Sequence, residues 1–96
     1  MNQLTIVAII RAESGKGDEA EAALQKLVEP TRAEDGCVQY DLHRDNTDPD
    51  RFLFYENWAS RPQWQAHMES PHIKAHKVAS EGLIAGVEIL EMTRSA

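Results

Sequence analysis

Three histidines lie within ten residues of one another, at positions 67, 72 and 76. An imidazole gains and loses a proton near neutral pH, so this side chain suits the removal of a proton from a weakly acidic group of a substrate. A helix break expected at Ser70-Pro71 can direct His67 and His72 toward one cavity. We therefore predict that both are catalytic, although they could instead tie the helices to a sheet or face solvent.

Glu56 is a carboxylate within the otherwise apolar and aromatic segment Arg51–Trp58. A buried carboxylate requires a hydrogen-bonding partner, which His67 or an arginine could supply. A carboxylate paired with His67 would orient the imidazole for acid–base chemistry. We predict Glu56 as the third catalytic residue; the alternative is a structural ion pair or an acid at the rim of the domain.

Aromatic side chains near these residues could bind a flat ligand by stacking. We predict that the substrate-binding residues are Tyr55, Trp58, Trp64 and His76. The hydroxyl of Tyr55 could also form a hydrogen bond with an oxygen atom of the substrate.

No motif for a cofactor stands out in the sequence. His72 and His76 have the i, i+4 spacing that can bind a metal on one helix face. However, no glutamate lies between them in the metalloprotease arrangement, and Cys37 is the only cysteine. We therefore expect no metal, flavin or haem, and we expect Cys37 to be a buried packing residue.

Size and charge limit the classes of partner. The chain has 96 residues, 27% of them charged, and a net charge of −6, which fits one globular domain over residues 1–96. Nucleic acid and anionic membranes would be repelled. The apolar run Leu4–Ile10 is too short to span a bilayer, and no signal-peptide pattern is seen, so a cytoplasmic location is expected.

The hydrophobic pattern predicts an α+β fold. Strands are expected over residues 4–10, 37–44, 51–58 and 87–93, and helices over about 18–35, 62–69 and 71–81, with a break at Pro30 and a stop at Gly36. Ser60 and Ser70 are predicted helix caps, with Gln63 closing a capping box. The order of these elements is the split βαβ order of ferredoxin-like domains.

Two of the predicted strands, residues 4–10 and 51–58, carry apolar residues on both faces. Helices would cover only one face of an antiparallel sheet, and the other would meet water in a monomer. We therefore predict a homodimer in which the uncovered faces of two sheets pack together.

Three segments resemble the antibiotic biosynthesis monooxygenase family, which includes small quinol monooxygenases. They are Ala33–Cys37 followed by Tyr40, Phe54–Trp58, and above all Trp64–Lys77. The resemblance implies a dimeric α+β barrel with one cleft per subunit. It also implies oxidation of a small quinol, anthrone or related enolisable aromatic compound by molecular oxygen, without flavin or metal.

The resemblance leaves other activities open, because relatives share the fold while their chemistry differs. An isomerase acting on a phosphorylated signal has a similar segment, and a non-catalytic ligand-binding role is a further alternative. Haem-degrading relatives bind iron through a histidine that matches His76. The negative charge of the chain and the missing asparagine in the first strand argue against haem.

Overall fold

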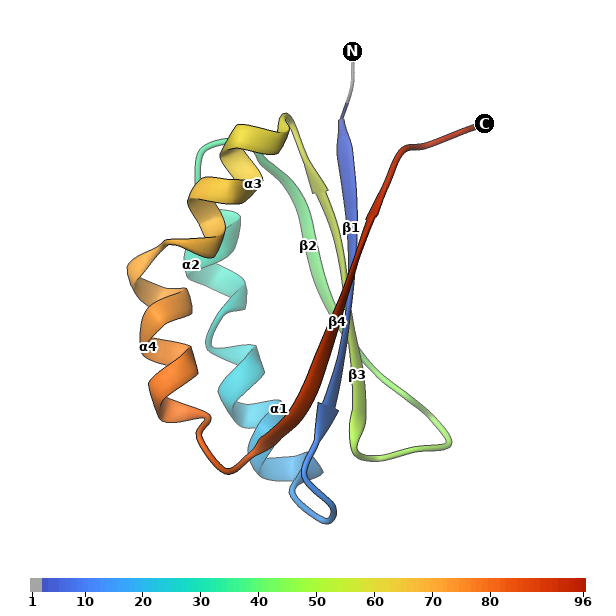
Figure 1. The fold of residues 1–96 in the computed structure, drawn as a ribbon, viewed down its shortest axis with the longest axis vertical. Helices are drawn as coiled ribbons and strands as arrows, with labels where there is room; N and C mark the ends of the chain where they lie inside the picture. The colour runs from blue at the N-terminus through green and yellow to red at the C-terminus, as the bar shows by residue number, and fades with distance from the viewer. Residues whose placement is uncertain (1–2) are drawn as a thin grey trace.

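The computed structural model describes residues 3–96 as one antiparallel sheet with helices on a single face (Figure 1). The elements in chain order are β1 (Leu4–Ala12), α1 (Gly17–Gln25), α2 (Val28–Arg32), β2 (Cys37–Arg44), β3 (Arg51–Trp58), α3 (Arg61–Met68), α4 (Pro71–Ala79) and β4 (Ile84–Met92). The strand order is β2-β3-β1-β4. This arrangement confirms the predicted ferredoxin-like α+β fold.

The element boundaries differ from the prediction mainly near β4. β2 and β3 have the predicted bounds, whereas β1 extends to Ala12, and α4 ends at Ala79 instead of residue 81. β4 begins at Ile84, three residues earlier than predicted, because the chain turns at Gly82, where φ is +82°. The early start lets β4 pair with nearly the whole length of β1.

The predicted helix break near Pro30 lies one turn before the proline. α1 ends at Gln25, and α2 begins at Val28, so Lys26 and Leu27 separate the two helices. Proline lacks an N–H and its ring clashes with the carbonyl four residues earlier, which here belongs to Lys26. The interruption therefore falls where the proline prevents a continuous helix.

Serine caps start both α3 and α4, as the sequence predicted. The Ser60 hydroxyl accepts a hydrogen bond from the backbone N–H of Gln63, and the Ser70 hydroxyl accepts one from Ile73, both at 3.3 Å. The predicted capping box is wrong in one detail, because the Gln63 side chain accepts from the Ser60 hydroxyl and not from its backbone N–H. The Ser60 cap fixes the turn from β3 into α3, and the Ser70 cap fixes the sharp turn between α3 and α4.

Alternation along the strands gives the sheet two different faces. Ile6, Phe52, Phe54 and Trp58 are buried beneath the helices and form the centre of the core. The opposite face, called the outer face here, has no helix over it (Figure 1). Its apolar residues include exposed Val38, Tyr55 and Met92, and Cys37 packs half-buried at the edge of the core.

No helix within residues 3–96 has both the length and the apolar character that a membrane span requires.

Candidate active site

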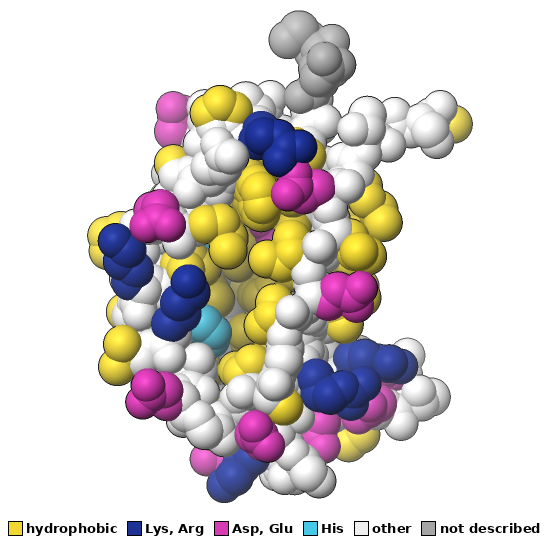
Figure 2. All heavy atoms as spheres, in the orientation of Figure 1, with side chains coloured by type: hydrophobic (Ala, Val, Ile, Leu, Met, Phe, Trp, Pro, Cys, Tyr) yellow, Lys and Arg dark blue, Asp and Glu magenta, His cyan; other side chains and the backbone are white. Residues whose placement is uncertain are grey.

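A cavity of about 430 Å³ lies between the helices and the sheet. Its walls are mostly aliphatic and aromatic side chains from β1, β3, β4, α1, α3 and α4. In the space-filling view, apolar side chains gather in a hollow between the helices and β4, and one histidine lies at the edge of this hollow (Figure 2). The volume is typical of pockets that bind small molecules.

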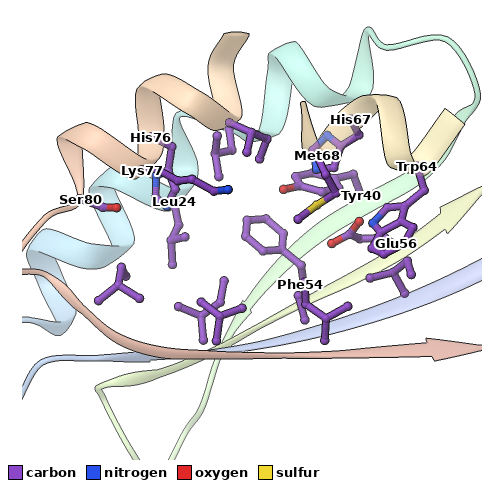
Figure 3. A pocket seen from close by; sticks show the side chains of 18 of the residues that line it. Leu24, Tyr40, Phe54, Glu56, Trp64, His67, Met68, His76, Lys77 and Ser80 are labelled. Atoms are coloured by element: carbon purple, nitrogen blue, oxygen red, sulfur yellow. The ribbon is translucent and has the colours of Figure 1, made fainter. Parts of the chain in front are cut away.

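Polar groups line the two ends of this cavity (Figure 3). Tyr40, Glu56, Trp64 and His67 lie at one end, which we call the acid–base end. His76, Lys77 and Ser80 lie at the opposite end, with Phe54 between the two groups. A ligand in the cavity would therefore contact titratable groups at its ends and apolar surface along its length.

His67 lies in the last turn of α3 and is 2% exposed. Its ring packs against Trp58 and Tyr40, with ring centroids 4.9 and 5.5 Å away. Nδ1 is 2.7 Å from the Oε2 atom of Glu34. The ring is therefore held by two aromatic neighbours and one charge-assisted hydrogen bond.

Glu34 lies in the turn between α2 and β2, and its Oε2 atom is also 2.7 Å from Nε2 of His72. The turn depends on Gly36, which has a φ of +86° and packs so closely against the Gln63 side chain that a Cβ at position 36 would force that side chain to move. The close approach brings Glu34 beside α3 and α4. One carboxylate oxygen thus joins two imidazoles from consecutive helices.

These contacts fix where the protons lie. A carboxylate oxygen only accepts hydrogen bonds, so Nδ1 of His67 and Nε2 of His72 each carry a proton. The second ring nitrogen of His67, Nε2, has no hydrogen-bond partner among residues 3–96. Because His67 lines the cavity, Nε2 is the nitrogen that can take a proton from a ligand.

Burial lowers the pKa of His67 below the usual value for a histidine. The hydrogen bond and negative charge of Glu34 oppose this effect, while the nearby His72 adds to it. The net result favours a neutral imidazole at neutral pH, which is the protonation state that a general base requires.

Glu56 is a second acid–base group at the same end of the cavity. It is 4% exposed, and the indole Nε1 of Trp58 donates a hydrogen bond to its Oε1 at 2.9 Å. Burial raises the pKa of Glu56 to about 7, against the lowering effect of the Trp58 hydrogen bond. The same surroundings raise the pKa of Tyr40, through burial and then through the charge of Glu56.

The structure places four of the predicted site residues on the cavity: His67, Glu56, Trp64 and His76. His72 lies behind Glu34 and does not line the cavity. The expected pairing of Glu56 with His67 is wrong, because Glu34 binds His67 and Trp58 binds Glu56.

Two predicted substrate-binding aromatics also lie away from the cavity. Trp58 is completely buried below His67, where its role is to support the ring and to bind Glu56. Tyr55 lies on the outer face, because successive residues of a strand point to opposite faces and its neighbour Glu56 points inward. Tyr55 therefore cannot reach a ligand in this cavity.

The sequence prediction did not include Glu34 and Tyr40 as site residues. Tyr40 could have been found from register, since it pairs with Glu56 across β2 and β3 and so shares its inward face. Glu34 had only a weak signal: an acid two positions before the glycine that ends the helical region.

Glu34, His67 and His72 also form the one cluster within residues 3–96 that has the ligand types of a metal site, with ligand atoms within 4.8 Å of one another. Tetrahedral zinc with bonds of about 2.1 Å would separate its ligand atoms by about 3.4 Å. The observed nitrogen–oxygen distances of 2.7 Å are those of direct hydrogen bonds. We therefore interpret the cluster as a hydrogen-bonded acid–base group.

Comparison with known proteins agrees with this architecture. The solved structure of PA3566 from Pseudomonas aeruginosa superimposes with a TM-score of 0.95 and 35% sequence identity, covering 100% of this chain and 97% of that one. The probable quinol monooxygenase YgiN of Escherichia coli K12 is 30% identical over 93% of this chain and 90% of its own length.

Some relatives are longer. The uncharacterised protein sll1783 of Synechocystis is 30% identical over 85% of this chain, but the match covers only 56% of that protein. The chain thus spans little more than half of this relative.

A family model described as antibiotic biosynthesis monooxygenase matches residues 3–79, which include Glu34, Glu56, His67 and His72. With most of its length matched in this way, the chain belongs to the antibiotic biosynthesis monooxygenase family.

Proposed function

We propose that this protein oxidises a small quinol, anthrone or related enolisable aromatic compound with molecular oxygen, using neither flavin nor metal. The observation that carries the proposal is the arrangement of His67, whose Nδ1 is bound to Glu34 while its Nε2 is free toward an apolar cavity. Membership of the family and the name of the Escherichia coli relative support the choice of reaction.

The first step is proton removal. Nε2 of His67 accepts a proton from the hydroxyl or activated C–H group of the substrate, and the imidazolium that forms is stabilised by the carboxylate of Glu34. The substrate becomes an electron-rich anion. The apolar walls exclude water and leave this anion available for oxygen.

The second step consumes oxygen. The carbanion carbon of the substrate adds to one oxygen atom of O₂, and the resulting peroxide takes back the proton from His67. Loss of water then converts the hydroperoxide into a carbonyl group. For an anthrone the balance is CH₂ + O₂ → C=O + H₂O, with one oxygen atom in each product.

The protonated carboxyl group of Glu56 can help to stabilise the substrate anion. With a pKa of about 7, a substantial share of this carboxyl group carries a proton at neutral pH. A protonated carboxyl can donate a hydrogen bond to the oxygen on which negative charge develops. Trp64 and Phe54 supply flat apolar surface beside it.

A second candidate function is isomerisation in the same cavity. It is favoured by the presence of a base, His67, and a titratable acid, Glu56, at one end. An isomerase would move a proton between two atoms of the substrate and would consume no oxygen.

Oxygen uptake by purified, metal-free protein over a panel of quinols and anthrones tests the proposal. The expected result is uptake of one O₂ per product, with ¹⁸O from ¹⁸O₂ in the product, and loss of this activity in His67→Ala. His43→Ala serves as the matched control, since His43 is exposed on β2 and does not line the cavity. Substrate conversion without oxygen uptake would favour isomerisation and refute the oxidation.

A further inference from the structure

Three polar side chains at the end of the cavity away from His67 have no part in the proposed reaction. They are His76 and Lys77 in the last turns of α4 and Ser80, which caps that helix, and we call this region the distal end. α4 has nine residues and is therefore about 13 Å long, and His67 precedes its first residue. A ligand that contacts both ends of the cavity must therefore be elongated (Figure 3).

We propose that the distal end is a subsite for a carboxylate, and that the substrate is a quinol or anthrone with an apolar chain that ends in this group. Lys77 and Ser80 bind the carboxylate while the reacting ring lies beside His67. The inference rests on the proposed oxidation, to which it adds the charge and the shape of the substrate.

Lys77 supplies the positive charge. It is the only lysine or arginine on the cavity lining within residues 3–96. Figure 3 shows its side chain extending from α4 into the cavity. Its ammonium group forms no ion pair or hydrogen bond within this part of the chain, whereas Lys74 on the same helix lies 3.8 Å from Glu69. Lys77 is therefore available to pair with an anionic group of a ligand.

Ser80 supplies a hydrogen-bond donor near this charge. The residue is only 6% exposed, and its side chain lines the cavity. The structure of residues 3–96 shows no hydrogen bond to or from its hydroxyl group, although its backbone N–H caps α4. Buried polar groups in proteins nearly always have a partner, so this hydroxyl favours a ligand that provides an acceptor. A carboxylate oxygen is such an acceptor, and a charged acceptor strengthens the bond.

The remaining polar groups favour a ligand with a single negative charge. Burial lowers the pKa of His76, so its imidazole is neutral at neutral pH and offers one N–H group. Glu81 also lines the cavity, four positions after Lys77, but α4 ends at Ala79 and no ion pair joins the two side chains. One lysine close to one glutamate suits a carboxylate better than a phosphate, whose charge is about −1.5 to −2.

The surface between the two ends of the cavity is apolar. Phe54 lies between them, and Leu24 lies close to the distal end (Figure 3). Polar atoms in the middle of a ligand would lose their hydrogen bonds to water there without replacement. The part of the substrate that connects the ring to the carboxylate is therefore a hydrocarbon chain.

The test is calorimetric binding of a naphthoquinone substituted with a methyl group and a propanoate chain, compared with the primary amide of the same compound. A quinone is the oxidised form of the proposed substrate class, so no turnover takes place. The amide keeps the size of the ligand and removes its charge. The carboxylate should bind about 5- to 10-fold more tightly than the amide, and high salt should reduce the difference.

Variants on α4 identify the source of this preference. Lys77→Gln should make the two affinities nearly equal. Lys74→Gln is the matched control, because it makes the same change of charge on the same helix at a residue that does not line the cavity. It should keep the full preference. Ser80→Ala should weaken binding of the carboxylate by about threefold.

Equal binding of carboxylate and amide by the parent, or a preference that survives in Lys77→Gln, would overturn the inference and leave the proposed oxidation intact. Tighter binding of a phosphate analogue than of the carboxylate would overturn the choice of ligand group. If neither quinone binds, the inference fails together with the proposed substrate class. A carboxylate preference in a protein that consumes no oxygen would support the subsite and refute only the oxidation.

Discussion

The Oε2 atom of Glu34 lies 2.7 Å from Nδ1 of His67, although the two residues are 33 positions apart in the chain. This contact joins the turn before β2 to the last turn of α3. A ring flip would replace Nδ1 by a carbon atom and lose the hydrogen bond. The contact therefore determines which nitrogen of His67 meets the cavity.

Gly36 is predicted to be essential for this contact. A Cβ at position 36 would lie 2.3 Å from Cδ of Gln63, and the φ of +86° is unfavourable for any residue with a side chain. Gly36→Ala should lower the free energy of unfolding by about 2–4 kcal/mol and reduce turnover, because Glu34 would move away from α3. Urea denaturation measures the first effect.

Gly15→Ala is the matched control for this change. Gly15 also has a positive φ, +78°, but nothing lies within 4 Å of the position of its Cβ. Gly15→Ala should lower the free energy of unfolding by only about 1 kcal/mol, because only the unfavourable backbone conformation contributes. Equal losses in the two variants would show that the contact with α3 is unimportant.

The buried carboxyl of Glu56 predicts a stability that falls as pH rises. Its pKa is about 7 in the folded protein and close to 4.5 in the unfolded chain. Between these values the folded state binds more protons, so the free energy of unfolding decreases with increasing pH across this range. The total loss should reach up to about 3 kcal/mol near pH 7 to 8.

Glu56→Gln should remove this pH dependence, since an amide does not titrate and its oxygen can still accept from Trp58. Stability of the variant relative to the parent should increase from pH 4.5 to pH 8 in urea denaturation. Glu88→Gln, at an exposed position of β4, should show no such trend. Parallel curves for parent and Glu56→Gln would contradict the burial argument.

The homodimer remains a prediction from the apolar outer face. Val38, Tyr55 and Met92 are exposed there, and Leu53 lies between them and the β2–β3 loop. Sedimentation should give about twice the mass of one chain. Leu53→Asp should dissociate this species, because burial of an unpaired charge between the sheets is costly.

Val78→Asp provides the control for dimerisation. Val78 is 72% exposed on α4, on the opposite side of the molecule from the outer face. This variant should sediment like the parent. A parent that is monomeric at micromolar concentration would refute the face-to-face arrangement.

We also expect purified protein to contain no stoichiometric metal, flavin or haem. Elemental analysis and an absorption spectrum after dialysis measure this directly. One transition metal per chain would contradict the expectation. The ligands to test would then be His72 and His76, from their spacing, and Glu34 with His67, from their positions in the structure.

Most of the fold was predictable because its signals are local. Strand alternation, the serine caps at Ser60 and Ser70, and the position of Pro30 each act within a few residues. Alternation also assigned Tyr55 and Trp58 to opposite faces of one strand. The sequence prediction nevertheless grouped both as substrate-binding residues by their aromatic type, and the structure follows the alternation.

The centre of the site could be predicted only in part. His67 and Glu56 stand out because their residue types are unusual in their segments. The partner of His67 depends on a contact across 33 positions and on a left-handed turn at Gly36, and no local pattern encodes such a contact. Two acids were available as partners, and the sequence alone favoured the wrong one.

The role of His67 as the general base is tested most directly by kcat/KM of His67→Ala relative to the parent, on a substrate that the parent converts, with folding verified first. Loss of a general base costs about 10²–10⁴-fold in rate. We predict a loss of this size, together with a parent rate that rises with pH through the titration of His67. Near-parent turnover by folded His67→Ala would contradict it.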